Sequence, residues 1–314
     1  MSDNEDHQRY ADCGSAWSQH AESDTFLYQY LTQNSGNEAL TGDTAFLNEY
    51  GEKVIYIGKT DSAGFDERLR NYFSEPTLMQ LYKDEQAEFA DISAISTELF
   101  SGMEILLQHF PALHPPEIYL HVSGLNQNVI VTDEILSLSA DKYLGAGYPL
   151  YQDFFYEYQR QLMTPDRVVP DYVLGFLMAN FPFKGNDEIL LDRMLYEGKL
   201  RYILSQVLSQ RKIWEAVAYT PEQYNWCTER QSKIWKSVLE NQHLFKPDYR
   251  TTSLYLNEAP YTATLPTDSP GRAGIWLGFQ IIVTYMENHP ETSWVELMNN
   301  IDYPELLKQS KFKP

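Results

Sequence analysis

The sequence predicts a mostly α-helical α+β fold with one small antiparallel sheet. Apolar residues recur at helical spacing through most of the second half, and three short runs rich in β-branched residues lie between residues 118 and 139. A hydrophobic content of 43% and an aromatic content of 14% are enough for a sizeable core. We expect one domain over residues 25–314, with helices and the sheet in 25–147 and helices in 148–314.

The first 24 residues read differently from the rest. They carry six acidic side chains against one arginine and few apolar residues. This composition predicts a flexible acidic tail.

In the first half we expect a short helix after Asp43, a strand at Val54–Ile57, and helices over Phe65–Tyr82 and Ile92–Phe110. Three short strands are predicted at residues 118–122, 128–131 and 135–139, and Gly124–Gln127 suits a hairpin turn between the first two. In the second half, helices are predicted at residues 149–161, 168–181, 187–210, 221–242, 271–288 and 293–300. Thr220 followed by Pro221 is typical of a helix start.

Charge and composition exclude several classes of protein. A net charge of −20 and a pI of about 4.7 leave no basic footprint for nucleic acid or for an anionic membrane surface. No apolar run reaches the roughly 18 residues of a membrane span. Residues 1–24 do not resemble a signal peptide, so the chain is cytosolic or its leader lies outside this sequence. Cys13 and Cys227 alone build neither a disulfide framework nor a thiolate zinc site.

The sequence predicts no metal and no cofactor. None of the seven histidines forms a His-Glu-x-x-His pair, and we interpret His109 and His114 as exposed side chains at a helix end. A nucleophile elbow, a phosphate loop and a dinucleotide fingerprint are likewise absent from the sequence.

Glu197 is the first candidate site residue, because it interrupts an otherwise apolar helix and precedes Gly198. Such a carboxylate can be a ligand or an acid–base group. The interpretation that we favour is an ion pair with Arg193 or Arg201, each four residues away.

The second candidate is the segment Thr267–Met286, in which a polar turn leads into an apolar helix with three glycines, Gly271, Gly274 and Gly278. Glycine inside a helix costs roughly 1 kcal/mol relative to alanine, so another backbone or a ligand is expected close by. We favour close packing over an anion site at the helix start.

The polar turn before this helix makes two further predictions. Asp268-Ser269-Pro270 has the pattern of a helix cap with proline in the first turn. Arg272 opposes the helix dipole there, so we expect it to pair with Asp268 or Glu197.

Several motifs occur in a fixed order along the chain. They are Asp141-Lys142-Tyr143-Leu144-Gly145, Met194–Lys199, Tyr219–Gln223 with Trp226, Ala259-Pro260, Ser269–Arg272 with Gly274, Trp276 and Gly278, and the terminal Ser310–Pro314. From about Phe46 onward this pattern resembles the gliding motility-associated lipoprotein GldB family of Bacteroidetes.

The resemblance implies a cell-envelope lipoprotein that supports gliding motility or a related envelope function and has no catalytic activity. It implies partners among the envelope proteins of a motility or secretion complex, attachment to the membrane through an acylated cysteine, and no nucleic acid. The chain departs from this pattern at its start, because Tyr10-Ala11-Asp12 before Cys13 is not a lipobox. The lipid anchor is therefore expected outside this sequence.

Such proteins also look similar to zinc peptidases of the gluzincin type, with a ligand glutamate in a Glu-Gly segment. Here Glu197-Gly198 is present, but Gly175, Phe176 and Ala179 stand where the histidine helix would carry its ligands. The resemblance therefore implies a zincin-like scaffold that has lost its metal, a pseudo-peptidase.

We place a protein- or peptide-binding groove between the Glu197 helix and the 271–286 helix, formed by Glu197, Asp268, Gly271, Arg272 and Gly274. The alternative is a hydrolase that uses Glu197 with Asp192 or Asp268 as a carboxylate pair.

Overall fold

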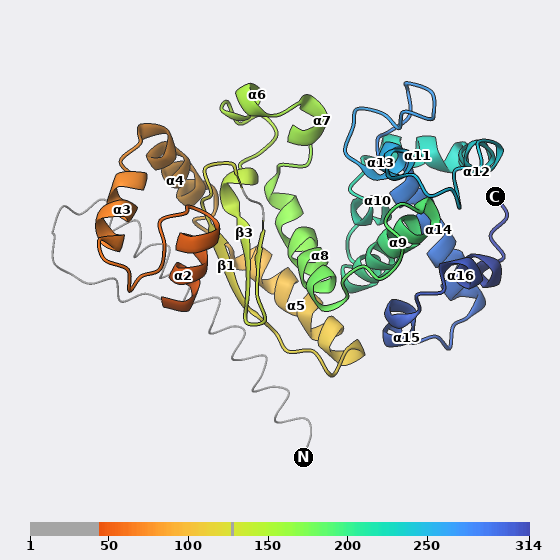
Figure 1. Ribbon diagram of the computed structural model, residues 1–314, viewed down its shortest axis with the longest axis horizontal. Coiled ribbons are helices and arrows are strands. Elements are labelled where there is room, and N and C mark those ends of the chain that lie inside the picture. The colour runs from red at the N-terminus through yellow and green to blue at the C-terminus, as the bar shows by residue number, and fades with distance from the viewer. Residues whose placement is uncertain (1–43, 127–128) are drawn as a thin grey trace, which may run out of the picture. The chain divides into compact units, whose positions relative to one another are not determined.

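The computed structural model describes residues 44–126 and 129–314, mostly helical with one small sheet (Figure 1). The predicted α+β fold class is confirmed. The predicted acidic tail and Cys13 lie outside the described residues.

The described residues form two compact units. Unit 1 holds residues 44–104 and 114–176, and unit 2 holds 105–113 and 177–314. The chain passes between them within helices α5 (Ser93–His109) and α8 (Val168–Asn180). The single domain over residues 25–314 stays a prediction.

Unit 1 begins with three helices, α2 (Thr44–Lys53), α3 (Phe65–Tyr72) and α4 (Pro76–Glu88). The predicted helix over Phe65–Tyr82 is thus two helices. The break comes at Glu75, whose carboxylate accepts a hydrogen bond from the Leu78 amide at 2.9 Å, with Pro76 in the first turn. A side-chain cap followed by proline starts a new helix.

The strand predicted at Val54–Ile57 does not form. The amides of Val54 and Ile55 donate to the Tyr50 carbonyl, and those of Ile57 and Gly58 donate to the Gly51 carbonyl. The segment therefore folds back on the end of α2, and these hydrogen bonds leave it no ladder to join.

The sheet has the strand order β1-β3-β2, formed by β1 (Glu117–His121), β2 (Val129–Val131) and β3 (Ile135–Ser139). β2 and β3 pair antiparallel, but β1 and β3 pair parallel with Glu117 opposite Ile135. The three strands were predicted correctly, whereas the purely antiparallel sheet and the hairpin between the first two strands are wrong. β3 lies between β1 and β2, so the sheet is mixed.

The loop after β1 is held by a buried carboxylate. Asp141 accepts hydrogen bonds from the amides of Ser123 at 3.1 Å and Leu125 at 2.7 Å. Asp141 lies in the short 3₁₀ helix η1 (Ala140–Lys142) that directly follows β3. These bonds fix the end of β1 beside the end of β3, which is the geometry of a parallel pair.

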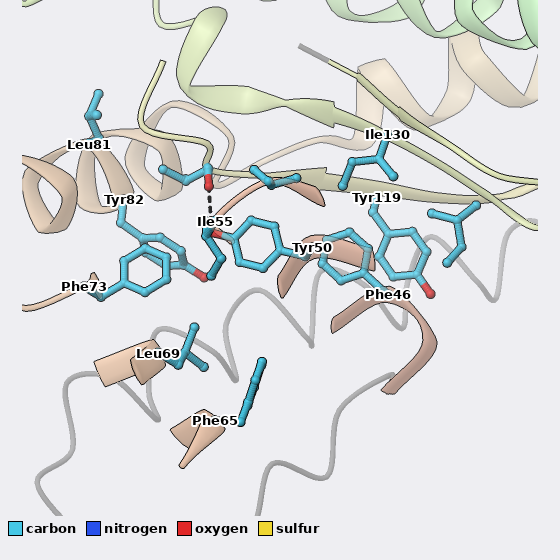
Figure 2. Close-up of a cluster of buried hydrophobic side chains, with 13 residues drawn as sticks. Phe46, Tyr50, Ile55, Phe65, Leu69, Phe73, Leu81, Tyr82, Tyr119 and Ile130 are labelled. Carbon is cyan, nitrogen blue, oxygen red and sulfur yellow. Dashed lines mark hydrogen bonds between the residues drawn. The ribbon is translucent and has the colours of Figure 1, made fainter. Parts of the chain in front are cut away.

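Helices cover both faces of the sheet. Tyr119, Ile130 and Ile135 face a core with side chains of α2, α3 and α4, which Figure 2 shows. There Phe46 stacks on Tyr119 with ring centroids 4.3 Å apart, and the Tyr50 hydroxyl donates to the Val122 carbonyl at 2.7 Å. On the other face, Leu136 meets α8 at Gly175, where an added methyl group would lie 3.3 Å away.

Unit 1 closes with short helices in the region predicted as one helix over 149–161. α6 (Tyr151–Phe154) and α7 (Glu157–Arg160) are separated by Phe155 and Tyr156, both in extended conformation, and η2 (Pro165–Arg167) leads into α8.

Unit 2 is helical, with α9 (Leu190–Val207) and α14 (Ala273–Asn288) at its centre. Around them lie α10 (Ile213–Ala216), α11 (Pro221–Glu229), α12 (Gln231–Glu240), α13 (Tyr249–Leu256), α15 (Trp294–Asn299) and α16 (Tyr303–Ser310). The helix predicted over 221–242 is interrupted at Arg230, and α10, α13 and α16 were not predicted.

The start of α11 was predicted correctly. The Thr220 side chain accepts a hydrogen bond from the Gln223 amide at 3.3 Å, and the Gln223 side chain accepts one from the Thr220 amide at 3.0 Å. Within the described residues, no helix combines the length and the apolar character needed to cross a membrane.

Candidate functional site

Glu197 lies on α9 between two arginines of the same helix. Its carboxylate forms an ion pair with Arg201 at 3.4 Å and another with Arg193 at 3.8 Å. Each partner is four residues away, one helical turn on either side. The predicted ion pair is confirmed with both candidate partners. Two guanidinium groups beside the carboxylate disfavour a metal cation at this position.

Next to Glu197, α9 and α14 meet backbone to backbone. A methyl group added at Gly198 would lie 2.4 Å from the Gly278 carbonyl carbon, and one added at Gly278 would lie 1.9 Å from the Met194 carbonyl oxygen. Only glycine fits this approach. The close packing predicted for Gly278 is confirmed, and at this crossing the predicted groove has no space.

The space beside the Cα atoms of Gly271 and Gly274 is likewise occupied by other parts of the chain. A methyl group at Gly271 would lie 2.2 Å from the Ala259 carbonyl oxygen, and one at Gly274 would lie 3.0 Å from the carbonyl oxygen of Tyr255 in α13. These two glycines therefore also serve packing, and protein backbone occupies the place where a ligand would approach.

The start of α14 differs from the prediction. The helix begins at Ala273, and no side chain of Asp268-Ser269-Pro270 caps it. Instead the Thr262 hydroxyl accepts a hydrogen bond from the Ala273 amide at 3.0 Å and donates to the Pro270 carbonyl at 2.8 Å. The predicted cap is wrong because a residue distant in sequence supplies the acceptor, and that amide is no longer available to an anion.

Arg272 pairs with neither carboxylate that the sequence suggested. Its Nη2 donates to the Ala218 carbonyl at 2.9 Å, and its guanidinium lies 5.9 Å from the centre of the Tyr219 ring. Ala218 follows the end of α10, where carbonyl groups carry partial negative charge and attract a cation. The Tyr219 hydroxyl in turn donates to the Gly271 carbonyl at 2.6 Å, so this cluster fixes the turn before α14.

Asp268 is exposed on the surface of unit 2. It accepts a hydrogen bond from the Trp226 indole at 2.9 Å, and the Arg230 guanidinium lies 4.8 Å from the centre of that ring. This pairing joins the turn before α14 to α11.

Asp192 lies five residues before Glu197 on α9, and its carboxylate accepts a hydrogen bond from the Asn186 amide at 2.9 Å. Burial raises the pKa of Asp192, and that hydrogen bond opposes the rise. Among the described residues, neither a hydrogen bond nor an ion pair connects Glu197 with Asp268 or Arg272.

Lys199 is a residue that the sequence reasoning missed. Its side chain is buried, its amino group donates to the Asn300 carbonyl and lies 4.8 Å from the centre of the Tyr303 ring, and burial lowers its pKa to about 8. Its position on the same helical face as Leu195 and Ile203 was a signal for this burial.

Unit 1 contains a second buried polar group that the sequence did not reveal. His121 Nδ1 lies 2.7 Å from the Ser137 hydroxyl, and its Nε2 has no hydrogen-bond partner among the described residues. Burial lowers the pKa of His121 to about 3, so the ring is neutral. With Ser137 fully buried as well, substrate has no access to this pair.

The described residues contain no group of three or more His, Cys, Asp or Glu side chains placed to hold a metal ion. Gly175, which stands where the histidine helix of a gluzincin would carry a zinc ligand, lies against Leu136 and Val129 of the sheet. The predicted absence of metal and cofactor stays a prediction.

One comparison with known proteins identifies a family. The family model described as gliding motility protein GldB matches residues 17–314. No curated protein and no solved structure gives a match.

Proposed function

Because the chain belongs to the GldB family of gliding motility proteins, we propose that it is a non-catalytic component of the gliding machinery or of a related envelope or secretion complex. The name of the family model marks a lipoprotein, which is a protein of the cell envelope. In this proposal the chain acts by binding a protein or peptide, and a lipid anchor holds it at the membrane.

The observation that carries the non-catalytic reading is the state of Glu197-Gly198. In a zincin-like peptidase this segment would present a carboxylate to a metal in an open cleft. Here the carboxylate is shared by Arg193 and Arg201, and Gly198 is packed against the backbone of α14. A pseudo-peptidase scaffold, in which the former ligand position has become part of the core, accounts for both features.

The packing of α9 against α14 leaves only part of the predicted binding groove accessible to a partner. Of Glu197, Asp268, Gly271, Arg272 and Gly274, the glycines are buried and Asp268 is exposed. We therefore place the partner contact at Asp268 and assign Gly271, Arg272 and Gly274 to holding that edge in place, whereas Glu197 forms its ion pairs within α9.

The test is gene replacement in a gliding host, with colony spreading as the readout. We expect Glu197→Gln to retain motility at normal protein levels, and Asp268→Ala to reduce it. Glu240→Gln, at an exposed position on α12, is the matched control. Protein purified without chelators should contain less than stoichiometric zinc. Stoichiometric zinc that is lost in Glu197→Gln would overturn the proposal.

A hydrolase remains the alternative, and the raised pKa of Asp192 is the observation that favours it. A carboxylic acid with a raised pKa is a candidate general acid. Incubation with a peptide library, followed by mass spectrometry, separates the two functions. Cleavage by the native protein that disappears in Asp192→Asn would establish the hydrolase, whereas intact peptides support the binding protein.

A further inference from the structure

Unit 1 carries an aromatic surface that is separate from the candidate site residues of unit 2. Six aromatic residues fall within residues 148–158, around α6 and α7. In Figure 1 these two short helices lie beyond the ends of the strands of unit 1. We name residues 151–160, which comprise α6, α7 and the link Phe155-Tyr156 between them, the aromatic ledge.

The inner side of the ledge is firmly anchored. Tyr151 is fully buried, and its hydroxyl donates to the Asp141 carbonyl at 2.6 Å and accepts from the Leu144 amide at 3.0 Å. Just before the ledge, the Tyr148 hydroxyl donates to Asp84 at 2.7 Å. The ledge is therefore fixed in place before any partner arrives, which lowers the entropic cost of binding.

The outer side presents apolar surface to solvent. Phe154 is 65% exposed and Tyr156 is 71% exposed. Tyr156 also stacks on Tyr158, with ring centroids 5.7 Å apart and an angle of 9° between the ring planes. Exposed, rigid aromatic side chains of this kind are enriched among the residues that carry binding energy at protein interfaces.

Charge indicates which partner fits this surface. Unit 1, from residue 44 onward, carries 20 acidic and 8 basic side chains, whereas unit 2 carries 16 acidic and 15 basic ones. On the ledge itself Asp153 and Glu157 are exposed, whereas the basic side chains are half-buried: Arg160 ends α7, and Lys142 lies 5.5 Å from the centre of the Phe155 ring. The net negative charge of the described residues is thus concentrated in the unit that carries the ledge, and such a field attracts cationic partners and repels anionic ones.

We propose that the aromatic ledge docks a basic segment of a protein partner, one that places an apolar side chain against Phe154 and Tyr156 and lysine or arginine beside Asp153 and Glu157. The inference rests on the proposed function, because it names the chemistry of the partner, and it adds a contact on unit 1 to the one at Asp268. A second copy of this acidic chain does not have the required charge.

The probes are fluorescent twelve-residue peptides with a central leucine or phenylalanine flanked by lysines, and a matched set flanked by glutamates. We expect fluorescence anisotropy to detect binding of the lysine set only. Because salt screens the charges, the affinity should fall by about tenfold or more between roughly 50 and 500 mM salt. The double variant Phe154→Ala/Tyr156→Ala should weaken it at least tenfold. The control double variant Phe245→Ala/Tyr249→Ala removes two exposed aromatic side chains of unit 2 and should leave it unchanged.

Three outcomes would overturn the proposed docking site: no binding of the lysine set, equal binding of the glutamate set, or binding that the double variant Phe154→Ala/Tyr156→Ala does not alter. Sedimentation velocity adds a fourth, a dimer that the ledge variant dissociates, which would identify a second copy as the occupant. Circular dichroism of both double variants verifies folding. Mass spectrometry of the recovered peptides keeps the two proposals apart, because cleaved peptides refute the non-catalytic function whatever the ledge does.

Discussion

His121 and Lys199 are buried ionisable side chains, and neither forms an ion pair among the described residues. In both, burial disfavours the charged form and lowers the pKa. Each therefore links the stability of its own unit to pH, in a range that depends on its pKa values in the folded and unfolded chain.

For His121 the folded pKa of about 3 lies below the ordinary value of 6.5. The unfolded chain therefore binds the proton first, and stability present above pH 6.5 is lost as the pH falls toward 3. Between pH 6.5 and 5 the expected loss is roughly 2 kcal/mol. In urea denaturation, the free energy of unfolding of His121→Gln should fall less over this pH range than that of the native protein. His114→Gln, at an exposed position, should behave like the native protein. Equal pH dependence in all three proteins would refute this prediction.

For Lys199 the folded pKa of about 8 lies below the ordinary value of 10.5. Below pH 8 the buried charge is a cost, and stability should rise as the pH increases from about 8 toward 10.5. From pH 8 to 9.5 the expected gain is roughly 2 kcal/mol. Lys199→Met should lack this gain, and Lys236→Met, at an exposed position, should keep it. A gain that persists in Lys199→Met would show that another group causes it.

At the scale of elements, the crossing of α9 and α14 is the feature on which unit 2 depends. Gly198 and Gly278 allow two helix backbones to touch, so each helix buries an apolar face that a larger residue would hold apart. The two family motifs that carry these glycines thus describe one contact.

Gly278→Ala should destabilise the protein by about 3 kcal/mol or more, because the added methyl group would lie 1.9 Å from the Met194 carbonyl oxygen in a contact between backbones. Gly147→Ala is the control, since nothing lies within 4 Å of the added group there. Thermal unfolding followed by circular dichroism measures both. Normal stability of Gly278→Ala would mean that the helices can separate at no cost.

Local signals predicted some elements and missed others for identifiable reasons. The Thr220 cap and the strand runs are determined by neighbours in sequence, so they were predictable. Val54–Ile57 has strand composition, but its amides donate hydrogen bonds to carbonyl groups at the end of α2. The short α10 and α16 have too few turns to show a clear periodicity.

For the whole molecule, net charge is the property that the sequence gives directly and that bears on function. The chain carries a net charge of −20, and unit 1 accounts for most of the negative charge in the described residues. Contacts with anionic surfaces are unfavourable for such a molecule, and contacts with cationic partners are favoured.

Vesicles of phosphatidylserine and phosphatidylcholine should therefore fail to sediment this chain at 0.1 M salt, when it is prepared without any lipid modification. A basic protein such as lysozyme serves as the positive control. Co-sedimentation that weakens as salt is added would contradict the prediction, because it would require a basic membrane-binding surface.

The candidate site was predictable only where its chemistry is local. The ion pairs of Glu197 follow from residues one turn away, and the glycines of α14 already indicated a close backbone. The acceptors for Arg272 and for the Ala273 amide come from Ala218 and Thr262, which no spacing rule connects to that helix.

The sequence by itself determined the helical fold class, the strand positions, the acidic character and the membership of the GldB family, because each depends on composition, short-range spacing or the order of motifs. Only the tertiary structure decided the parallel pairing of β1 with β3, the burial of Lys199 and His121, and the backbone contact at Gly198. These features join residues far apart in the chain, and their free energies exist only once the partners have been brought together.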